Sequence, residues 1–198
     1  MGVSVFHRFR WESEGEAVSA GQVSPFNPGS SPQSGLKWYA VHTRARHEKV
    51  VAAQFRSRGL DCYLPLVEEI HRWSDRRKRV LVPLFSGYAF IHASESAETV
   101  AAVRQVQSVV GLVGAQPGGT AIPEAEINTV CRLLSHNIPC VNYPFLKVGR
   151  RVRIRGGALE GLEGTLVSVQ GTTSFVVSIE LIQRSLAVRI EGYDIEVL

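Results

Sequence analysis

Val148–Leu166, VGRRVRIRGGALEGLEGTL, is the most specific part of the sequence. Its first half alternates apolar and basic residues like a half-buried strand, and its end begins a second strand. The turn between them carries three glycines from Gly157 to Gly164, which allow positive φ angles and close backbone approach. Leu159 and Leu162 lie in the same turn, and two interpretations remain open for them. They either close one end of an apolar core or form a patch for a partner.

The rest of the C-terminal region supports a small β-barrel. After Lys147, short apolar segments alternate with glycines and polar turns. Strands are predicted at 152–154, 164–169, 174–181, 185–190 and 194–197. So many short strands within about fifty residues favour a closed barrel, because closure leaves no free strand edge. Residues 148–198 are therefore predicted to be an all-β domain.

Residues 37–135 alternate strand and helix patterns and predict an α+β domain. Lys37–His42, KWYAVH, is aromatic and β-branched like a strand, and Val51 and Phe55 follow at helical spacing until Gly59. Extended segments are expected at 62–66, 68–73, 79–84, 87–92 and 109–113, with a hairpin tip at 74–78. Helices are expected at 95–106 and after Pro123. The apolar residues after Pro123 recur at helical spacing, which predicts one buried face. The pattern predicts a mixed or antiparallel sheet flanked by helices.

Two other segments lack periodic patterns. Residues 1–36 include the Ser-, Pro- and Gly-rich stretch 24–35 and are predicted to be a disordered N-terminal extension. Residues 136–147 contain two prolines and no period, which predicts a linker between the two domains.

Positive charge is concentrated in one region of the chain. Residues 37–79 contain 11 basic and 5 acidic residues, whereas residues 80–146 contain 2 basic and 4 acidic ones. Such a local field favours a polyanionic partner, for which nucleic acid is the default candidate.

The composition also excludes several classes. Three widely spaced cysteines fit neither a disulfide framework nor a zinc site, and favour a reducing, cytoplasmic compartment. No apolar run approaches the roughly 18–20 residues that span a bilayer, and a secretory signal is not expected. No nucleophile elbow, phosphate loop or metal-spaced histidine set is present. We therefore expect a non-enzymatic binding protein without cofactor or metal.

Several motifs together resemble the NusG family of transcription factors. The run 148–166 resembles a KOW motif, and 174–188 resembles the rest of the NusG C-terminal domain. The motifs that fall in the order of the NusG N-terminal (NGN) domain are Trp38-Tyr39, Leu64-Pro65, Pro83-Leu84-Phe85, Gly87-Tyr88, and Val113 followed by Pro123. Thr43–Val50 and Arg72–Arg76 are most similar to specialised paralogs of the UpxY and LoaP type. The resemblance covers residues 37–198 and implies an NGN-like domain joined to a small, SH3-like KOW barrel.

The resemblance implies partners for the N-terminal domain. NusG proteins bind the clamp helices of the largest RNA polymerase subunit through an apolar pocket. The matching residues here are Tyr39, Pro65, Phe85 and Tyr88. Basic residues at the positions that face non-template or upstream DNA are Arg44, Arg46, His47, Lys49, Arg76, Arg77, Lys78 and Arg79. Lysine and arginine contacts to phosphate give affinity without sequence choice.

The resemblance also implies a recruiting role for the barrel. Its partner-binding residues would be Leu159, Leu162, Ile182 and Arg184. Partners in the family include a small-subunit ribosomal protein and the termination factor Rho. The implied protein is a monomeric elongation factor that suppresses pausing and termination at particular operons.

Three alternatives remain open at the level of sequence. One is a housekeeping NusG that couples polymerase to Rho or the ribosome, and another is a ribosome- or RNA-binding KOW protein. The third is a fold switch of the RfaH type, in which the barrel rests as a helical hairpin. The β-branched residues of segment 176–188 favour strands, so we expect a stable barrel.

Overall fold

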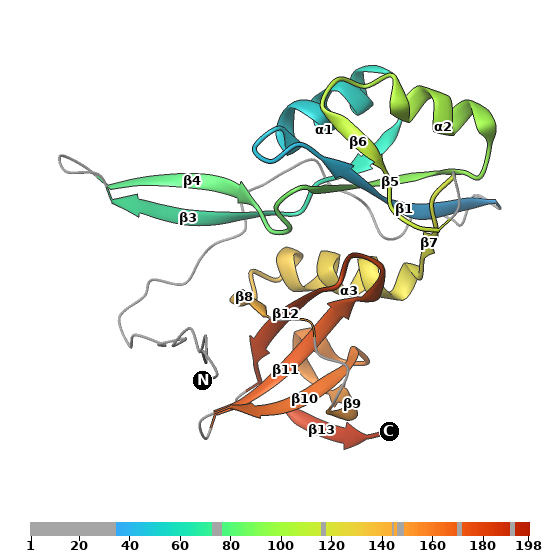
Figure 1. The fold of residues 1–198 in the computed structure, drawn as a ribbon. Helices are drawn as coiled ribbons and strands as arrows, with labels where there is room; N and C mark the ends of the chain where they lie inside the picture. The colour runs from blue at the N-terminus through green and yellow to red at the C-terminus, as the bar shows by residue number, and fades with distance from the viewer. Residues whose placement is uncertain are drawn as a thin grey trace, which may run out of the picture.

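The computed structural model describes residues 35–72, 77–115, 118–143, 145, 149–169, 172–190 and 193–198 (Figure 1). Its N-terminal part contains β1 (Leu36–Thr43), α1 (Glu48–Ser57), β2 (Asp61–Tyr63), β3 (Leu66–Arg72), β4 (Arg77–Pro83), β5 (Tyr88–Ser94), α2 (Ala97–Arg104), β6 (Val109–Leu112), β7 (Ala121–Ile122) and α3 (Glu124–Ser135). Its C-terminal part contains β8 (Cys140–Tyr143), β9 (Arg150–Arg155), η1 (Gly157–Leu159), β10 (Glu163–Val169), β11 (Thr172–Ile179), η2 (Glu180–Ile182), β12 (Arg184–Arg189) and β13 (Asp194–Val197). The predicted fold class, an α+β domain followed by an all-β domain, is confirmed.

The register of the N-terminal sheet decides which side chains share a face. Its strands run in the order β2-β5-β1-β6, β7 also pairs with β1, and every pairing is antiparallel. His42 of β1 lies opposite Tyr88 of β5, and Tyr39 lies opposite Ile91. Successive strand residues point to opposite faces while paired residues share one. His42 and Tyr88 therefore lie on one face, and Tyr39 lies on the other.

The face that carries Tyr39 is covered by α1 and α2 and has a core of its own. Val51 and Phe55 of α1 are fully buried there with Val41 and Ile91 of the sheet, as their helical spacing predicts. The helix α2 begins after Ser96, whose Oγ accepts a hydrogen bond from the Thr99 backbone N–H. No helix within the described ranges is long and apolar enough to cross a membrane.

The opposite face is covered by α3, which lies between the N-terminal sheet and the C-terminal strands in Figure 1 and contacts both β1 and β11. Ile127 and Val130 of α3 are buried as predicted. The apolar core that starts at Trp38 and Phe90 of the N-terminal sheet continues through α3 into the C-terminal domain, where it includes Leu159. One continuous core thus joins the two parts of the chain.

The C-terminal strands form a sheet in the order β13-β9-β10-β11-β12-β8, with all pairings antiparallel. Gly157 and Gly161 have φ angles of 69° and 79°, and a Cβ on Gly164 would lie 2.6 Å from Phe175 Cζ, so the glycine turn has its predicted features. The predicted closure of the barrel differs from the observed pairing. Among the described residues the path of paired strands is open, because β8 takes the edge of β12 that closure would use.

The segment 136–147, expected to be a linker, contains the strand β8. Cys140 of β8 lies opposite Val188 of β12, and Asn142 lies opposite Leu186. A four-residue strand between Pro139 and Pro144 is too short to carry a periodic pattern, which is why the sequence predicts only a connection there. The strands β3 and β4 pair only with each other and form a ribbon that extends away from the rest of the described structure (Figure 1).

Candidate functional site

An aromatic pair lies at the surface of the N-terminal sheet, on the face that α3 partly covers. The rings of His42 and Tyr88 are stacked with centroids 5.4 Å apart and planes 26° from parallel. His42 is exposed and Tyr88 is half-buried. A flat aromatic surface of this kind, with one edge in solvent, is typical of anchors that bind protein partners.

A buried carboxylate fixes the turn that precedes Tyr88. The Gly87 backbone N–H donates to Glu48 Oε1 at 2.7 Å, and the Gly87 carbonyl accepts from the Thr43 N–H at 2.8 Å. Glu48 is only 2% exposed, and Gly87 has a φ of 83°. These bonds tie the end of β1, the first turn of α1 and the start of β5 together, so they define the position of the tyrosine.

The four residues predicted to form one polymerase pocket do not share one surface. Phe85 is 2% exposed and packs edge-to-face on Phe90 with centroids 5.9 Å apart, so it lies in the core beneath the sheet. Pro65 is buried, and its carbonyl accepts the Leu84 N–H at 2.9 Å. Tyr39 lies on the opposite face of the sheet. Of the four, Tyr88 alone combines the α3-side face with an exposed edge.

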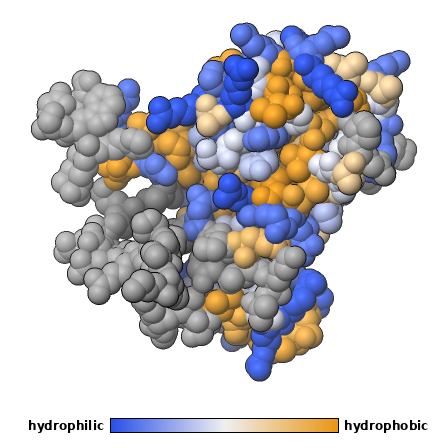
Figure 2. Space-filling model, in the orientation of Figure 1, coloured by the Kyte–Doolittle hydropathy of each residue, from blue (hydrophilic) through white to orange (hydrophobic). Residues whose placement is uncertain are grey.

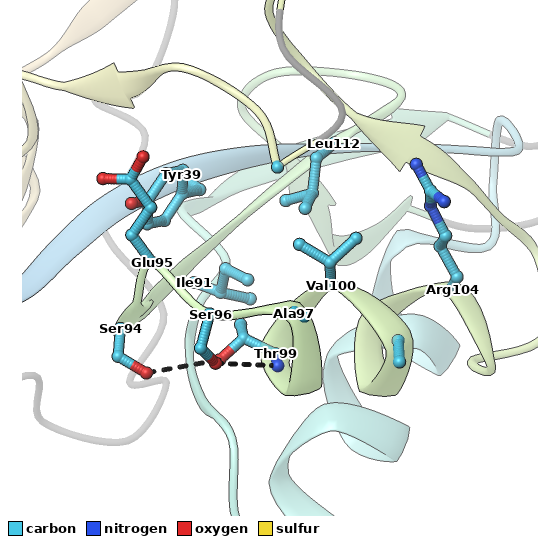
Figure 3. A pocket seen from close by; sticks show the side chains of 12 residues that line it. Tyr39, Ile91, Ser94, Glu95, Ser96, Ala97, Thr99, Val100, Arg104 and Leu112 are labelled. Atoms are coloured by element: carbon cyan, nitrogen blue, oxygen red, sulfur yellow. Dashed lines mark hydrogen bonds between the residues drawn. The ribbon is translucent and has the colours of Figure 1, made fainter.

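Tyr39 instead lines a cavity of about 570 Å³ beside α2 (Figure 3). The walls combine apolar and polar side chains, among them Ile91, Ser94, Glu95, Val100, Arg104 and Leu112. Tyr39 is 3% exposed, and burial raises the pKa of its hydroxyl. That hydroxyl has no hydrogen-bond partner in the described structure. The structure therefore separates Tyr39 from the aromatic pair by the thickness of the sheet.

The loop from Thr43 to the start of α1 presents the first group of predicted basic residues. Arg44, Arg46, His47 and Lys49 are all exposed. Arg46 has a φ of 67°, and His47 Nδ1 lies 3.1 Å from the Ala45 carbonyl oxygen. Lys49 Nζ donates to the Leu81 carbonyl at 2.5 Å, which joins α1 to the base of the ribbon. This basic loop directly follows His42 in the chain, so exposed cationic side chains come within a few residues of the aromatic pair in the sequence.

The second predicted basic group lies on the ribbon. Lys78 is exposed, and Arg79 Nη1 lies 3.7 Å from Glu68 Oε2 across the two strands. Both side chains of that ion pair keep solvent exposure, so it neutralises Arg79 only weakly. Arg77 begins β4, whereas Arg76 lies outside the described residues.

Three of the four residues predicted to bind a partner of the C-terminal domain are buried. Leu159 is 0% exposed, Leu162 and Ile182 are each 5% exposed, and Arg184 is exposed. The three buried residues belong to the apolar core to which α3 also contributes. Two interpretations of Leu159 and Leu162 were open from the sequence, and their burial favours the one in which they close one end of the apolar core.

Polar contacts hold α3 against the two short helical turns that carry Leu159 and Ile182. Arg132 Nη2 donates to the carbonyls of Ala158 at 3.1 Å and Glu160 at 3.0 Å. The Glu180 backbone N–H donates to Glu126 Oε2 at 3.2 Å. Burial raises the pKa of the Glu126 carboxyl, and the hydrogen bond from Glu180 opposes that shift. The first turn, η1, and the second, η2, are thus each bonded to one side chain of the same helix.

Two residues of the candidate site, His42 of the aromatic pair and Arg132 of the α3 contacts, were not predicted from the sequence. His42 had a usable signal, because residues two apart on a strand, such as Ala40 and His42, point to the same face of the sheet. Arg132 had none, because its acceptors lie more than 25 positions away. Among the described residues, no group of three or more His, Cys, Asp or Glu side chains could hold a metal ion.

Comparisons with known proteins find similarity to one family of transcription factors. Residues 36–131 match the family model described as "Transcription termination factor nusG". The chain is 29% identical over 182 residues to the transcription termination/antitermination protein NusG of Borreliella burgdorferi, covering 80% of this chain and 97% of that protein. It is 26% identical over 184 residues to the NusG of Staphylococcus aureus, covering 85% and 100%. A solved structure described as "Domain interaction in Thermotoga maritima NusG" aligns over 80% of this chain and 96% of its own, with 23% identity and a TM-score of 0.46.

Proposed function

We propose that this chain is a non-enzymatic transcription factor of the NusG family, and that it binds RNA polymerase and suppresses pausing and termination at particular operons. The family assignment includes an NGN domain and a KOW-like domain. In this proposal residues 37–135 bind the polymerase and residues 148–198 recruit a further factor. The effect arises from stronger binding to the elongating state than to the paused state, without bond chemistry.

The stacked pair His42–Tyr88 carries this proposal. It lies on paired strands, keeps an exposed edge, and is followed by the basic loop 43–49. Such a surface suits a helix of the polymerase clamp, because aromatic anchors contribute much of the energy of helix-in-groove contacts. Phe85 and Pro65 support it from the core rather than by contact.

The basic groups supply the contact with DNA in this proposal. Arg44, Arg46 and His47 extend from the aromatic pair, and Lys78 and Arg79 extend along the ribbon. Phosphate contacts from such side chains weaken steeply as salt rises. Non-template or upstream DNA beside the polymerase would meet both groups when the aromatic pair is docked.

A reconstituted elongation complex tests the proposal. Tyr88→Ala should abolish the anti-pausing effect and weaken polymerase binding by at least tenfold. Tyr193→Ala removes a half-buried tyrosine of the C-terminal domain and serves as the matched control, with binding unchanged. Thermal unfolding of both variants separates lost contact from lost fold. Equal binding by Tyr88→Ala and wild type would refute the assigned surface.

The names of the relatives include termination as well as antitermination, which favours a second candidate, a factor that couples polymerase to Rho or the ribosome. A termination assay with and without Rho separates the two. Longer transcripts independent of Rho support antitermination, whereas Rho-dependent shortening supports the coupling factor. Recovery of ribosomes without polymerase subunits would instead support a ribosome-binding protein.

A further inference from the structure

The last strand of the C-terminal sheet has an unpaired edge. In the described part of the chain β13 pairs with β9 alone, and all four of its residues are exposed. The other end of the same sheet is different, because β8 covers the edge of β12 and Ser185–Val188 are buried. Natural proteins protect a free edge by keeping the strand short, with charged side chains, above all lysine, with proline or with a bulge. Asp194–Val197 is short and carries two acidic residues, but it contains no lysine or proline, and its register with β9 is continuous.

One side of β13 is apolar and uncovered. Ile195 lies opposite Ile154 and Val197 opposite Val152, and both of these β9 residues are fully buried in the core. Ile195 is nevertheless 39% exposed and Val197 55% exposed, and Leu198 beyond the strand is 51% exposed. Figure 2 shows hydrophobic side chains at the surface of the lower part of the molecule, where β13 lies in Figure 1. On the side of the sheet that faces the core, the side chains of β9 are therefore covered, whereas those of the next strand, β13, are exposed to solvent.

The other side of β13 completes a ladder of alternating charge. Glu163 of β10 pairs with Arg153 of β9, whose Nη1 lies 3.7 Å from Glu196 Oε2 of β13. Glu196 also accepts from Arg155, and Asp194 lies opposite Arg155 in the register. Reading across the strands, the signs run negative, positive, negative. A strand added beside β13 would therefore lie opposite two acidic residues, Asp194 and Glu196, where basic side chains are favoured.

We propose that the free edge of β13 is a strand-addition site for an extended segment of a protein partner in which basic and apolar residues alternate. Its backbone extends the antiparallel sheet, its apolar side chains cover Ile195 and Val197, and its basic side chains lie opposite Asp194 and Glu196. A second copy of this chain does not fit, because pairing β13 with itself would place carboxylates against carboxylates. The site goes beyond the proposed function, and it is tested without polymerase.

The test uses the full chain and a synthetic peptide, acetyl-Lys-Val-Lys-Val-Lys-Val-amide, with binding followed by NMR titration. The peptide should bind and should slow hydrogen exchange at the amides of 194–197. Val197→Lys should weaken binding at least tenfold. Val110→Lys is the matched control, since Val110 of β6 is 61% exposed in the N-terminal domain, and should leave binding unchanged. A peptide with the same composition in blocks, three lysines followed by three valines, should not bind.

Three results would overturn the proposal. One is equal affinity for the alternating and block peptides, which indicates plain charge attraction. Another is equal affinity of a Glu-Val alternating peptide, since the charge ladder would then have no effect. The last is a dimer of the wild-type chain that Val197→Lys dissolves, which makes a second copy the occupant. Protection at 194–197 is read on the wild-type chain, so it decides the question even where a variant folds poorly.

Discussion

Two regions of the C-terminal domain, the part that packs on α3 (the α3 end) and the edge strand β13 (the β13 end), carry similar apolar side chains in opposite surroundings. At the α3 end, Leu159, Leu162 and Ile182 are almost completely buried, although the resemblance to the NusG family implies a partner surface there. At the β13 end, Ile195 and Val197 belong to an unremarkable terminal segment, yet they are exposed. The difference teaches that a motif identifies side chains, whereas the neighbouring elements decide whether a partner can reach them.

Side chains of α3 account for the difference. Its apolar stripe continues the core of the strands, and Arg132 and Glu126 bind the backbone of η1 and η2. The β13 end has no such helix among the described residues; its backbone pairs with β9, and the side-chain contacts on its outer side are exposed ion pairs. Exposed ion pairs contribute little free energy, at most about 1 kcal/mol each. The two ends should therefore respond very differently to the same substitution.

The largest contrast is expected from removing one leucine at each end. Leu159→Ala leaves a cavity in the shared core and should lower the free energy of unfolding by about 2–5 kcal/mol. Leu198→Ala, at a leucine that is 51% exposed, should change it by less than about 0.5 kcal/mol. Urea unfolding of both variants measures the difference. Similar small losses for both would mean that Leu159 faces solvent and is available to a partner.

Thiol chemistry gives the next contrast. Burial raises the pKa of Cys131 on α3 and of Cys140 on β8 to about 11. Because the thiolate is the reactive form, both should be alkylated about a hundredfold more slowly at pH 8 than an ordinary exposed cysteine. An engineered Val197→Cys at the β13 end should react at the ordinary rate. Mass spectrometry of labelled peptides resolves each site, and fast labelling of Cys140 would show that the α3 end opens readily.

A smaller loss is expected from the contact between α3 and η1. Arg132→Ala leaves the carbonyls of Ala158 and Glu160 without their donor and should cost about 1–2 kcal/mol. Arg184→Ala removes an exposed arginine of the C-terminal domain and should be nearly neutral. Calorimetry compares the two melting temperatures. Equal melting temperatures would contradict the role of Arg132 in holding α3.

Sequence reasoning predicted the elements better than their contacts. The aromatic strand at Lys37, the helix after Pro123 and the glycine turn from Gly157 were all predicted, because each has a local pattern. The strand β8 was not, since four residues between prolines show no period. Contacts between distant segments depend on register and docking, which no local pattern encodes.

The candidate site shows the same limit. Tyr39 and Tyr88 both follow family motifs, but the pairing of β1 with β5 places them on opposite faces. Knowledge of one paired position, His42 with Tyr88, would have sufficed to separate them. The exposure of the basic residues was easier to predict, because charged side chains stay in solvent, and those that the structure describes at side-chain level are exposed; their role in DNA binding stays a prediction.

The smallest effect concerns Glu126, the second polar side chain with which α3 holds the C-terminal domain. Burial raises its carboxyl pKa above that of the unfolded chain, so the folded state binds the proton more tightly. This stabilisation is fully present below the unfolded pKa and is lost as pH rises through the folded pKa. Glu126→Gln keeps an acceptor for the Glu180 N–H but carries no charge. It should therefore raise stability at pH 7 slightly, by less than about 1 kcal/mol, and the gain should shrink towards pH 4.

The control for this substitution is Glu124→Gln, because Glu124 is an exposed carboxylate in the same first turn of α3. Both substitutions remove a negative charge from a helix N-terminus, where that charge is favourable. Only Glu126→Gln also removes the cost of burying the charge, so only that variant should gain stability at neutral pH. A loss of stability at pH 7 in both variants would mean that Glu126 is solvated, and that α3 covers the C-terminal domain less closely than its contacts indicate.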